Sequence, residues 1–321
     1  MKKIPIVFAF DDNYALPASI AIRSLLDYKN KDTDYEVIVF HSGLKQSTIK
    51  KMESICPIRW IKVCADALKN VPQGWSGLET YYRLLIAELL PEYDRVLWSD
   101  VDVLFQGDLS EVYHQDMKGA DWGGIIAERQ DETAGRHPHY TENTKPFIYM
   151  SGFMLIDAKL WRQKKMWNRF LETIKTYGRR LQFFDLDVLN LTADKIFPIG
   201  FEYCVLENIY DAENIKDAPE YPWLERAVGH QALAFAKKHP VIIHYAGKSP
   251  KIWYRKKVEI PEYYWKYIEQ SPFYKKSDYV WTKAKALELC MLKIVKALVL
   301  IKPWRQKIKK KITKLKGQRE K

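Results

Sequence analysis

The chain has 321 residues and a formal net charge of +12, from 52 basic and 40 acidic side chains. Of these, 14 basic and two acidic residues lie at positions 283–321, so the first 282 residues carry 38 of each sign. The basicity therefore belongs to a C-terminal tail. A balanced globular part argues against nucleic-acid binding over its main surface, because such binding needs a basic face.

The cysteines and the N-terminus bear on the compartment. No close pair and no Cys-x-x-Cys motif is formed by the four cysteines Cys56, Cys64, Cys204 and Cys290. Their spacing predicts reduced thiols, as in cytosolic proteins. The first apolar run, residues 4–10, is short and is followed at once by two aspartates, which is not the pattern of a signal peptide. We therefore expect a cytoplasmic protein.

The first sixty residues alternate apolar runs with helical patterns. We expect strands over 5–10, 35–41 and 58–63, separated by a helix from about residue 18 and a helix over 46–55. This order predicts a parallel sheet with right-handed crossovers. The first turn holds Asp11 and Asp12 and lacks Gly-x-Gly-x-x-Gly, which argues against a Rossmann dinucleotide site.

Further elements follow up to residue 253. We expect a helix over 78–90, strands over 96–98, 122–127 and 149–156, helices over 159–177 and 185–193, a strand over 241–244 and a turn over 247–253. Residues 128–146 are polar and contain Gly135, Pro138 and Pro146. We expect a long loop there, of the kind that often covers a binding site.

The apolar run 96–98 ends in two carboxylates, Asp100 and Asp102. Two acids at the rim of a core lose hydration, and a bound divalent cation is the usual compensation. Ligands of open α/β sheets also bind outside the carboxyl ends of the strands. The pair is therefore a candidate metal site, although a polar turn after the strand would have the same residues.

Other side chains that could bind a ligand or a metal ion follow predicted strands or stand at the start of a predicted helix. They are Asp11 and Asn13, Asp185 and Asp187, and His244 with Lys248 or Lys251. A lone histidine after an apolar strand is more often a core residue than a metal ligand. The convergence of these sites, rather than any one of them, favours a common binding site.

The ordered set of motifs resembles the family 8 retaining glycosyltransferases, which include glycogenin and bacterial lipopolysaccharide galactosyl- and glucosyltransferases. The similarity covers residues 4 to about 255. It rests on Phe8-Ala9-Phe10-Asp11-Asp12-Asn13-Tyr14, Trp98-Ser99-Asp100-Val101-Asp102, Tyr149-Met150-Ser151-Gly152, Phe184-Asp185-Leu186-Asp187-Val188-Leu189-Asn190 and His244-Tyr245-Ala246-Gly247.

The resemblance implies roles for the motif residues. Asp100, Asp102 and His244 would hold Mn²⁺, with Mg²⁺ as the second choice, and a mixed oxygen and imidazole donor set suits Mn²⁺. Arg83 and Asp185, with Asp187, would be the catalytic residues, with Asp185 contacting hydroxyl groups of the sugar. The UDP-sugar would contact Ala9, Asp11, Asn13, Arg83, Asp100, Ser151, Gly247, Lys248 and Lys251.

Three positions depart from the family pattern. Met150 stands where asparagine is common, Leu186 stands where glutamine is common, and the lysine after His244 falls at 248 or 251, off the usual spacing. Leucine cannot act as a nucleophile. Retention then needs another nucleophile, such as Asp185 or Asp187, or departure and attack on one face of the sugar, and we favour the second route. The loss of asparagine and glutamine removes two groups that could recognise sugar hydroxyls, so the hexose is left open. The sequence does not name the linkage or the acceptor either.

The resulting prediction is a GT-A-type α/β domain over residues 1–282, with a mixed, mostly parallel sheet. We expect a metal-dependent enzyme that transfers a hexose, galactose or glucose, from a UDP-sugar to a saccharide acceptor of a cell-surface glycan such as lipopolysaccharide. Two alternatives remain: a sugar nucleotidyltransferase or phosphoesterase, and a catalytically inactive glycan-binding or scaffold protein with the same fold.

The basic tail, residues 283–321, has apolar residues at helical spacing on both sides of Pro303. No apolar run approaches the ~20 residues needed to span a bilayer. We expect amphipathic helices that lie on an anionic membrane, with each lysine contributing on the order of 1 kcal/mol near such a surface. The enzyme would then sit on the inner face of the cytoplasmic membrane, next to a lipid-linked acceptor. A solvated basic tail is the alternative.

Overall fold

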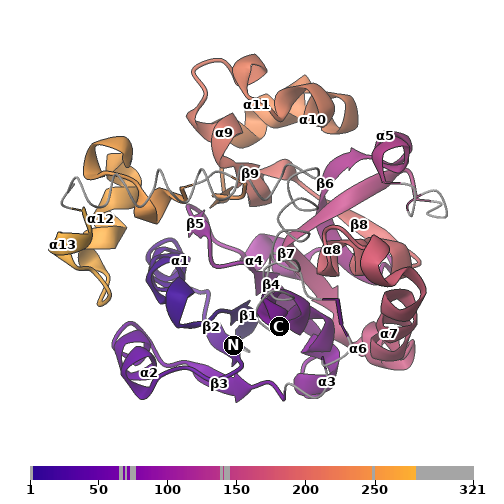
Figure 1. The fold of residues 1–321 in the computed structure, drawn as a ribbon, viewed down its shortest axis with the longest axis horizontal. Helices are drawn as coiled ribbons and strands as arrows, with labels where there is room; N and C mark the ends of the chain where they lie inside the picture. The colour runs from indigo at the N-terminus through magenta and orange to yellow at the C-terminus, as the bar shows by residue number, and fades with distance from the viewer. Residues whose placement is uncertain are drawn as a thin grey trace, which may run out of the picture. The chain divides into compact units, whose positions relative to one another are not determined.

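The computed structural model describes residues 3–64, 68, 71–72, 77–137, 140, 145–247 and 250–279. One compact unit comprises the described residues up to Trp253 together with Pro261–Tyr274, and the described residues Tyr254–Ile260 and Lys275–Tyr279 belong to a second. All the described strands lie in the first unit (Figure 1). The predicted boundary after residue 282 and the predicted tail lie outside the described residues, so the domain division stays a prediction.

The strands form two sheets. They are β1 (Ile4–Ala9), β2 (Tyr35–His41), β3 (Arg59–Lys62), β4 (Arg95–Ser99), β5 (Val103–Phe105), β6 (Trp122–Arg129), β7 (Phe147–Asp157), β8 (Ile196–Ile199), β9 (Val205–Leu206) and β10 (Ile242–His244). The main sheet has the order β3-β2-β1-β4-β7-β6-β8, and the smaller one β5-β10-β9. In the main sheet β7 runs antiparallel to β4 and β6, whereas the other neighbours are parallel. The predicted mixed, mostly parallel sheet is confirmed.

The described helices lie between these strands in the sequence or follow the last of them. The α-helices are α1 (Ala15–Asp27), α2 (Gln46–Glu53), α3 (Ile86–Leu89), α4 (Ser110–His114), α5 (Gln130–Arg136), α6 (Ala158–Gln163), α7 (Met166–Tyr177), α8 (Asp185–Thr192), α9 (Glu207–Asp211), α10 (Tyr221–Val228), α11 (His230–Lys238), α12 (Glu262–Gln270) and α13 (Lys276–Tyr279). Short 3₁₀ helices span Asp12–Tyr14, Leu78–Leu85, Gly178–Arg180, Phe201–Cys204, Ile215–Asp217, Ile252–Tyr254 and Lys257–Glu259. Within the part of the chain described here, no helix is both long enough and apolar enough to cross a bilayer.

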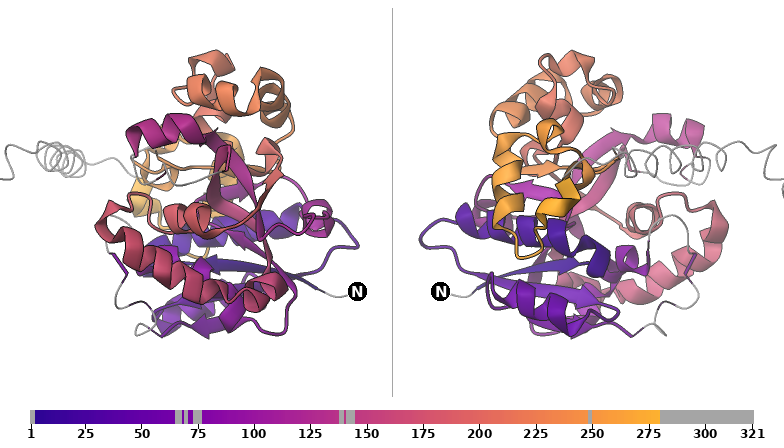
Figure 2. Two further views of the ribbon diagram at one scale, coloured as in Figure 1. Left: turned by 90° about the vertical axis from the view of Figure 1, so that its right-hand side faces the viewer. Right: turned by 60° about the vertical axis from the view of Figure 1, so that its left-hand side comes forward.

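Side chains of the main sheet alternate between two apolar cores, one on each face. Along β1, Ile6 and Phe8 belong to one core and Val7 to the other. The first core includes residues of α1, α10 and α11, and the second includes residues of α3, α6, α7 and α8, so helices cover both faces (Figures 1 and 2). Burial on both faces explains why the central strands have nearly continuous apolar sequences.

Three predicted elements differ from the structure. The predicted loop 128–146 is wrong in part, because β6 continues to Arg129 and α5 follows, with Thr133 buried against the sheet. The predicted helix 159–177 is two helices, since Lys164 is held by carboxylates of Asp121 and Asp194 and Lys165 turns the chain with φ +51°. The helix predicted over 78–90 is mostly 3₁₀, and Arg83 donates to the Thr80 carbonyl within it.

A buried asparagine joins α8 to β7. The Asn190 side-chain amide donates to the carbonyl of Tyr149 at 2.8 Å, and its oxygen accepts from the Tyr149 N–H at 2.8 Å. Asn190 is fully buried, so these bonds have no competition from water. The amide thus takes the place of a neighbouring strand and fixes α8, which begins with Asp185, against the strand that carries Ser151.

Replacement of Asn190 tests this joint. Asn190→Ala is expected to lower the free energy of unfolding by about 2–4 kcal/mol, because it leaves a buried N–H and a buried C=O of Tyr149 without partners. Urea denaturation measures the loss. Asn168→Ala, at an exposed position of α7, is the control and should change stability by less than about 0.5 kcal/mol. Equal effects of the two substitutions would contradict the assigned role.

Candidate active site

The site is built where the carboxyl end of β4 faces β10. Asp100 follows β4 directly, and its backbone N–H donates to the Gly152 carbonyl of β7 at 2.8 Å. Asp102 lies one turn further, at the start of β5. His244 ends β10, where it is paired with Val103 of β5 and Leu206 of β9. The smaller sheet therefore brings a residue more than 140 positions away in the sequence onto the two aspartates.

Asp100, Asp102 and His244 form a set of three possible metal ligands. One ligand atom from each residue lies within 4.8 Å of the others. His244 Nε2 is 3.1 Å from Asp102 Oδ1 and 3.8 Å from Asp100 Oδ2. Two carboxylates and an imidazole nitrogen that converge in this way, at the rim of a core, fit a hard to borderline divalent ion such as Mn²⁺. The donor set predicted from the sequence is therefore brought together.

Gly152 makes room for this set. A Cβ atom built at Gly152 would lie 2.5 Å from Cε1 of His244, 2.9 Å from its Nδ1 and 3.3 Å from Oδ2 of Asp100. The buried imidazole has little freedom to withdraw. Glycine is thus required at position 152, because His244 and Asp100 lie too close to it for a side chain.

Gly152→Ala is expected to push His244 off its position and weaken Mn²⁺ binding by at least about tenfold. The displacement also costs packing energy, about 1–3 kcal/mol by analogy with overpacked cores. Calorimetric titration with Mn²⁺ and thermal unfolding separate the two effects. Gly135→Ala, where a Cβ atom meets nothing within 4 Å, is the control. Unchanged Mn²⁺ affinity in Gly152→Ala would show that the imidazole does not bind the ion.

The carboxylate of Asp102 lies between Lys251 and His244. Lys251 Nζ donates to Asp102 Oδ2 at 2.7 Å and to the Tyr245 carbonyl at 2.8 Å. Burial would raise the pKa of Asp102, but His244 and Lys251 outweigh it and hold this pKa below its usual value. Burial would likewise lower the pKa of His244, and Cys204 and Asp102 more than offset it. Both neighbours thus favour the carboxylate form of Asp102.

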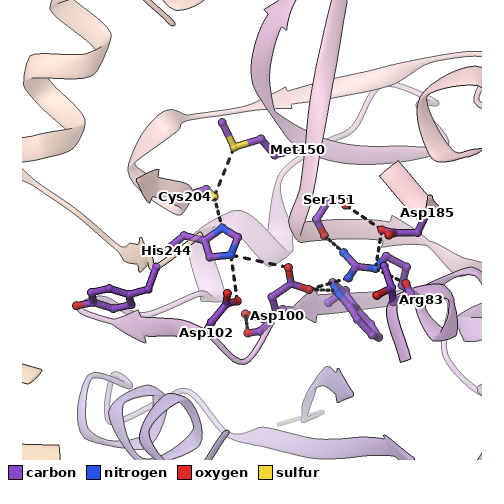
Figure 3. A network of polar contacts seen from close by, with 12 residues as sticks. Arg83, Asp100, Asp102, Met150, Ser151, Asp185, Cys204 and His244 are labelled. Atoms are coloured by element: carbon purple, nitrogen blue, oxygen red, sulfur yellow. Dashed lines mark hydrogen bonds and ion pairs between the residues drawn. The ribbon is translucent and has the colours of Figure 1, made fainter. Parts of the chain in front are cut away.

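Arg83 links Asp100 to Asp185. Its Nη2 donates to Asp100 Oδ1 at 2.8 Å, its Nε lies 3.1 Å from Asp185 Oδ2, and its Nη1 donates to the Ser151 carbonyl. The guanidinium carbon lies 4.6 Å from the centre of the Trp98 ring. Arg83 is only 5% exposed, so its position is fixed from several sides (Figure 3).

Asp185 is a buried carboxylate at the start of α8. Besides Arg83 it accepts a hydrogen bond from Ser151 Oγ at 3.0 Å. Burial raises the pKa of Asp185 to about 7, against the opposing effect of Arg83. A buried acid with such a pKa next to a possible metal site is a frequent property of functional carboxylates.

Asp187, which the sequence could not distinguish from Asp185, has a different environment. It is fully buried and accepts hydrogen bonds from Tyr140 Oη at 2.6 Å and from the N–H groups of Gln182 at 2.6 Å and Phe183 at 3.1 Å. These bonds hold the segment that leads into α8. In the structure Asp187 contacts the segment before α8, whereas Asp185 contacts Arg83; the predicted catalytic role of Asp187 stays a prediction.

The predicted nucleotide residues Ala9, Asp11 and Asn13 lie at the carboxyl end of β1. Val7 pairs with Trp98, so Ala9 is level with Asp100 on the neighbouring strand. Asp11 accepts from the N–H of Asn13 at 3.0 Å and from its side-chain amide at 2.7 Å, which shapes the turn before α1. Asp11 is the N-cap of the 3₁₀ helix Asp12–Tyr14, and α1 follows it directly at residue 15 rather than at 18.

Of the residues predicted after β10, Gly247 is described and Lys248 is not. Gly247 has φ +83°, a backbone conformation that glycine adopts without strain. Lys248 lies outside the described residues. Lys251 therefore supplies the described contact to the site, whereas a contact from Lys248 stays a prediction.

One neighbour of the site was missed by sequence reasoning. Cys204, at the end of a 3₁₀ helix, places its sulfur 3.3 Å from His244 Nδ1. It lies 40 residues from His244 and belongs to no spaced motif, so no sequence signal pointed to it. Cys56 and Cys204 are not in a disulfide within the described chain.

Comparison with known proteins agrees with this geometry. The model of glycosyl transferase family 8 matches residues 5–257. Glycosyltransferase GlyF of Streptococcus pneumoniae is 25% identical over 254 residues, which span 75% of this chain and 55% of GlyF. The lipopolysaccharide 1,2-glucosyltransferase of Escherichia coli is 25% identical over 281 residues, or 84% of this chain and 78% of that protein. The chain thus spans little more than half the length of GlyF.

A solved structure shows the same fold. Galactosyltransferase LgtC, crystallised with donor and acceptor sugar analogues, superposes with a TM-score of 0.68 at 22% identity, covering 85% of this chain and 98% of LgtC. This likeness confirms the predicted GT-A-type fold. Together with the family match over nearly all of the described chain, it leads to one conclusion: the chain belongs to glycosyl transferase family 8.

Proposed function

We propose that this glycosyltransferase moves a hexose, galactose or glucose, from a UDP-sugar to a saccharide acceptor of a cell-surface glycan such as lipopolysaccharide. The observation that carries the proposal is the convergence of Asp100, Asp102 and His244 beside Arg83 and Lys251. A bound complex of a metal ion and a diphosphate needs anionic ligands for the metal ion and fixed cations for the phosphate oxygens. This site offers both. The activities in the names of the Escherichia coli glucosyltransferase and of LgtC support a hexose donor.

In this proposal, the side chains of the site contact different parts of the UDP-sugar. Asp100, Asp102 and His244 would hold Mn²⁺, which supplies charge neutralisation for a departing diphosphate. Lys251 and Arg83 would orient phosphate oxygens, and Ser151 and Asp185 would accept or donate hydrogen bonds to sugar hydroxyl groups. Ala9, Asp11 and Asn13 would line the uridine at the end of β1.

Leu186 restricts the route of the reaction. It is half-buried beside Asp185 and carries no lone pair that could attack the sugar. We favour attack of the acceptor oxygen on the face that UDP leaves. The bond from the anomeric carbon to the UDP oxygen breaks, the bond to the acceptor oxygen forms, and the acceptor proton passes to the departing phosphate oxygen, so the configuration is retained.

A panel of UDP-sugars tests the function. UDP release is measured with UDP-galactose, UDP-glucose, UDP-N-acetylglucosamine and UDP-glucuronate, with and without Mn²⁺. Metal-dependent release from a UDP-hexose supports the proposal, and product analysis by NMR should show a retained anomeric configuration. Release from none of them would favour an inactive glycan-binding protein of the same fold, and an inverted product would overturn the route.

The basic tail extends the proposal to the membrane. We propose that residues 283–321 hold the enzyme on the inner face of the cytoplasmic membrane, next to a lipid-linked acceptor, because the excess of 12 positive charges lies there together with apolar residues at helical spacing.

Truncation after Trp281 is expected to abolish sedimentation with anionic vesicles at low salt while preserving turnover of a soluble acceptor. The globular part has no net charge to replace the tail. Vesicles of neutral lipid are the control for the full chain. Equal sedimentation of the truncated and full-length proteins with anionic vesicles would show that the tail has another purpose.

A further inference from the structure

Two sulfur atoms lie behind the histidine of the proposed metal site. Cys204 Sγ is 3.3 Å from Nδ1 of His244 and 3.8 Å from Sδ of Met150 (Figure 3). The three residues come from three elements, the 3₁₀ helix Phe201–Cys204, β10 and β7. Cys204 is 1% exposed and His244 is 7% exposed, so water does not compete for these contacts.

The direction of the hydrogen bonds follows from the chemistry of these groups when His244 Nε2 serves as a metal ligand. A thioether has no hydrogen to donate, so Met150 can only accept. The Cys204 S–H can donate to Met150 at 3.8 Å, which leaves the sulfur lone pairs toward His244. A metal ion in the proposed site would take the Nε2 lone pair of His244, so the one proton of the neutral imidazole would lie on Nδ1, which faces the Cys204 sulfur.

We propose that Met150 and Cys204 act as positioning residues that set the tautomer of His244. The Nδ1–H of His244 donates to Cys204 and the Cys204 S–H donates to Met150, so the Nε2 lone pair is directed at Asp100 and Asp102. The inference rests on the proposed metal function of these three ligands. Its physical basis is general: a metal-binding histidine is oriented by the partner of its other ring nitrogen.

The arrangement also fixes the ring in space. His244 Nε2 lies 3.1 Å from Asp102 Oδ1, on the side opposite to the sulfur. Gly152 bounds one side of the same ring, since a Cβ there would come within 3 Å of it. The sulfur pair therefore supplies the remaining polar contact that holds the imidazole in the ligand position.

Three substitutions in the full chain test the proposal. Mn²⁺ is titrated in the presence of UDP, and free Mn²⁺ is followed by electron paramagnetic resonance. Cys204→Ala should weaken binding about tenfold, because Nδ1–H loses its acceptor. Cys204→Ser, which has a similar volume but keeps a donor and an acceptor, should stay within about threefold of the wild type. Met150→Leu should weaken binding about two- to fivefold, because the S–H is no longer held away from His244.

A second readout reports on the proton itself. With Mg²⁺ and UDP bound, the Nδ1–H of His244 should give a slowly exchanging imidazole resonance in the wild type and in Cys204→Ser, and this resonance should be lost in Cys204→Ala. Thermal unfolding of the Ala and Ser variants shows whether their folds are equally stable. Equal Mn²⁺ affinities for these two variants, or wild-type affinity in Cys204→Ala, would overturn the proposal.

Asp102→Asn separates this inference from the function on which it rests. Loss of Mn²⁺ binding in Asp102→Asn with wild-type binding in Cys204→Ala overturns the tautomer proposal alone. Wild-type Mn²⁺ binding in Asp102→Asn overturns both, because the ion would then bind elsewhere.

Discussion

Asp102→Asn is expected to lower kcat/KM for the UDP-sugar by at least about 10²–10³-fold, a loss typical for removal of a group that stabilises developing charge. Asp102 directs one oxygen to His244 Nε2 and the other to Lys251, at 3.1 and 2.7 Å. The amide removes a negative charge from the cation site and leaves Lys251 without its counter-ion. Steady-state kinetics at saturating metal, well below the unfolding temperature, measures the loss.

Asp108→Asn is the matched control for Asp102→Asn. Asp108 lies six residues further along the chain and accepts hydrogen bonds from the Asn30 N–H at 2.9 Å, from Tyr35 Oη at 2.9 Å and from the Ser110 N–H at 2.8 Å. Its replacement should lower the unfolding temperature and leave Mn²⁺ affinity unchanged.

Chelation of the wild type should abolish activity, and Mn²⁺ should restore it better than Mg²⁺, because an imidazole ligand favours Mn²⁺. Full activity in excess chelator would refute the assignment.

The sequence was informative where one short segment determines both the structure and the chemistry. The run before Asp100 is apolar on both faces, and this predicted a buried strand that ends in a rim of acids. The same reasoning predicted β1 and the turn at Asp11. Local patterns of this kind predict the structure well, because a strand that is buried on both faces of a sheet must be apolar along its length.

Other parts of the site depend on contacts between distant segments, which periodicity cannot show. His244 reaches the aspartates because β10 pairs with β5 in a separate sheet, rather than in the main one. The break at Lys165 follows from ion pairs of Lys164 with residues 43 and 30 positions away. Cys204 faces His244 across the same small sheet. Such partners follow from topology, and no spacing in the sequence encodes them.

Asp185→Asn is expected to lower kcat/KM by at least about 10²-fold, the second large effect at this site. The substitution keeps an oxygen that can accept from Ser151 Oγ but removes the negative charge opposite Arg83 Nε, so the sugar and Arg83 lose a charged partner. The fold should not suffer, because burial already disfavours the ionised carboxylate. Kinetics and urea denaturation at pH 8 test both statements, and the variant should be at least as stable as the wild type.

The pH dependence follows from the same carboxyl group. Its pKa in the folded chain is about 7, above the ~3.9 of an unfolded aspartate. Between these values the folded state binds more protons, so this group makes the wild type less stable as the pH rises from about 4 to 7. If the ionised form is the active one, kcat/KM rises through about pH 7. Asp185→Asn should remove both the rise in kcat/KM and this contribution to the pH dependence of stability.

Asp187→Asn, two residues away in the same helix, should have the opposite outcome. Asp187 accepts from Tyr140 Oη and from two backbone N–H groups, so an amide would place an N–H against at least one of these donors. A buried donor without an acceptor costs about 1–3 kcal/mol, and the unfolding temperature should fall while the pH profile keeps its rise near 7. The experiment would thus distinguish the two neighbouring acids: Asp185 would act on the sugar, and Asp187 would support the helix. Loss of the pH-dependent rise in Asp187→Asn rather than in Asp185→Asn would reverse the two roles.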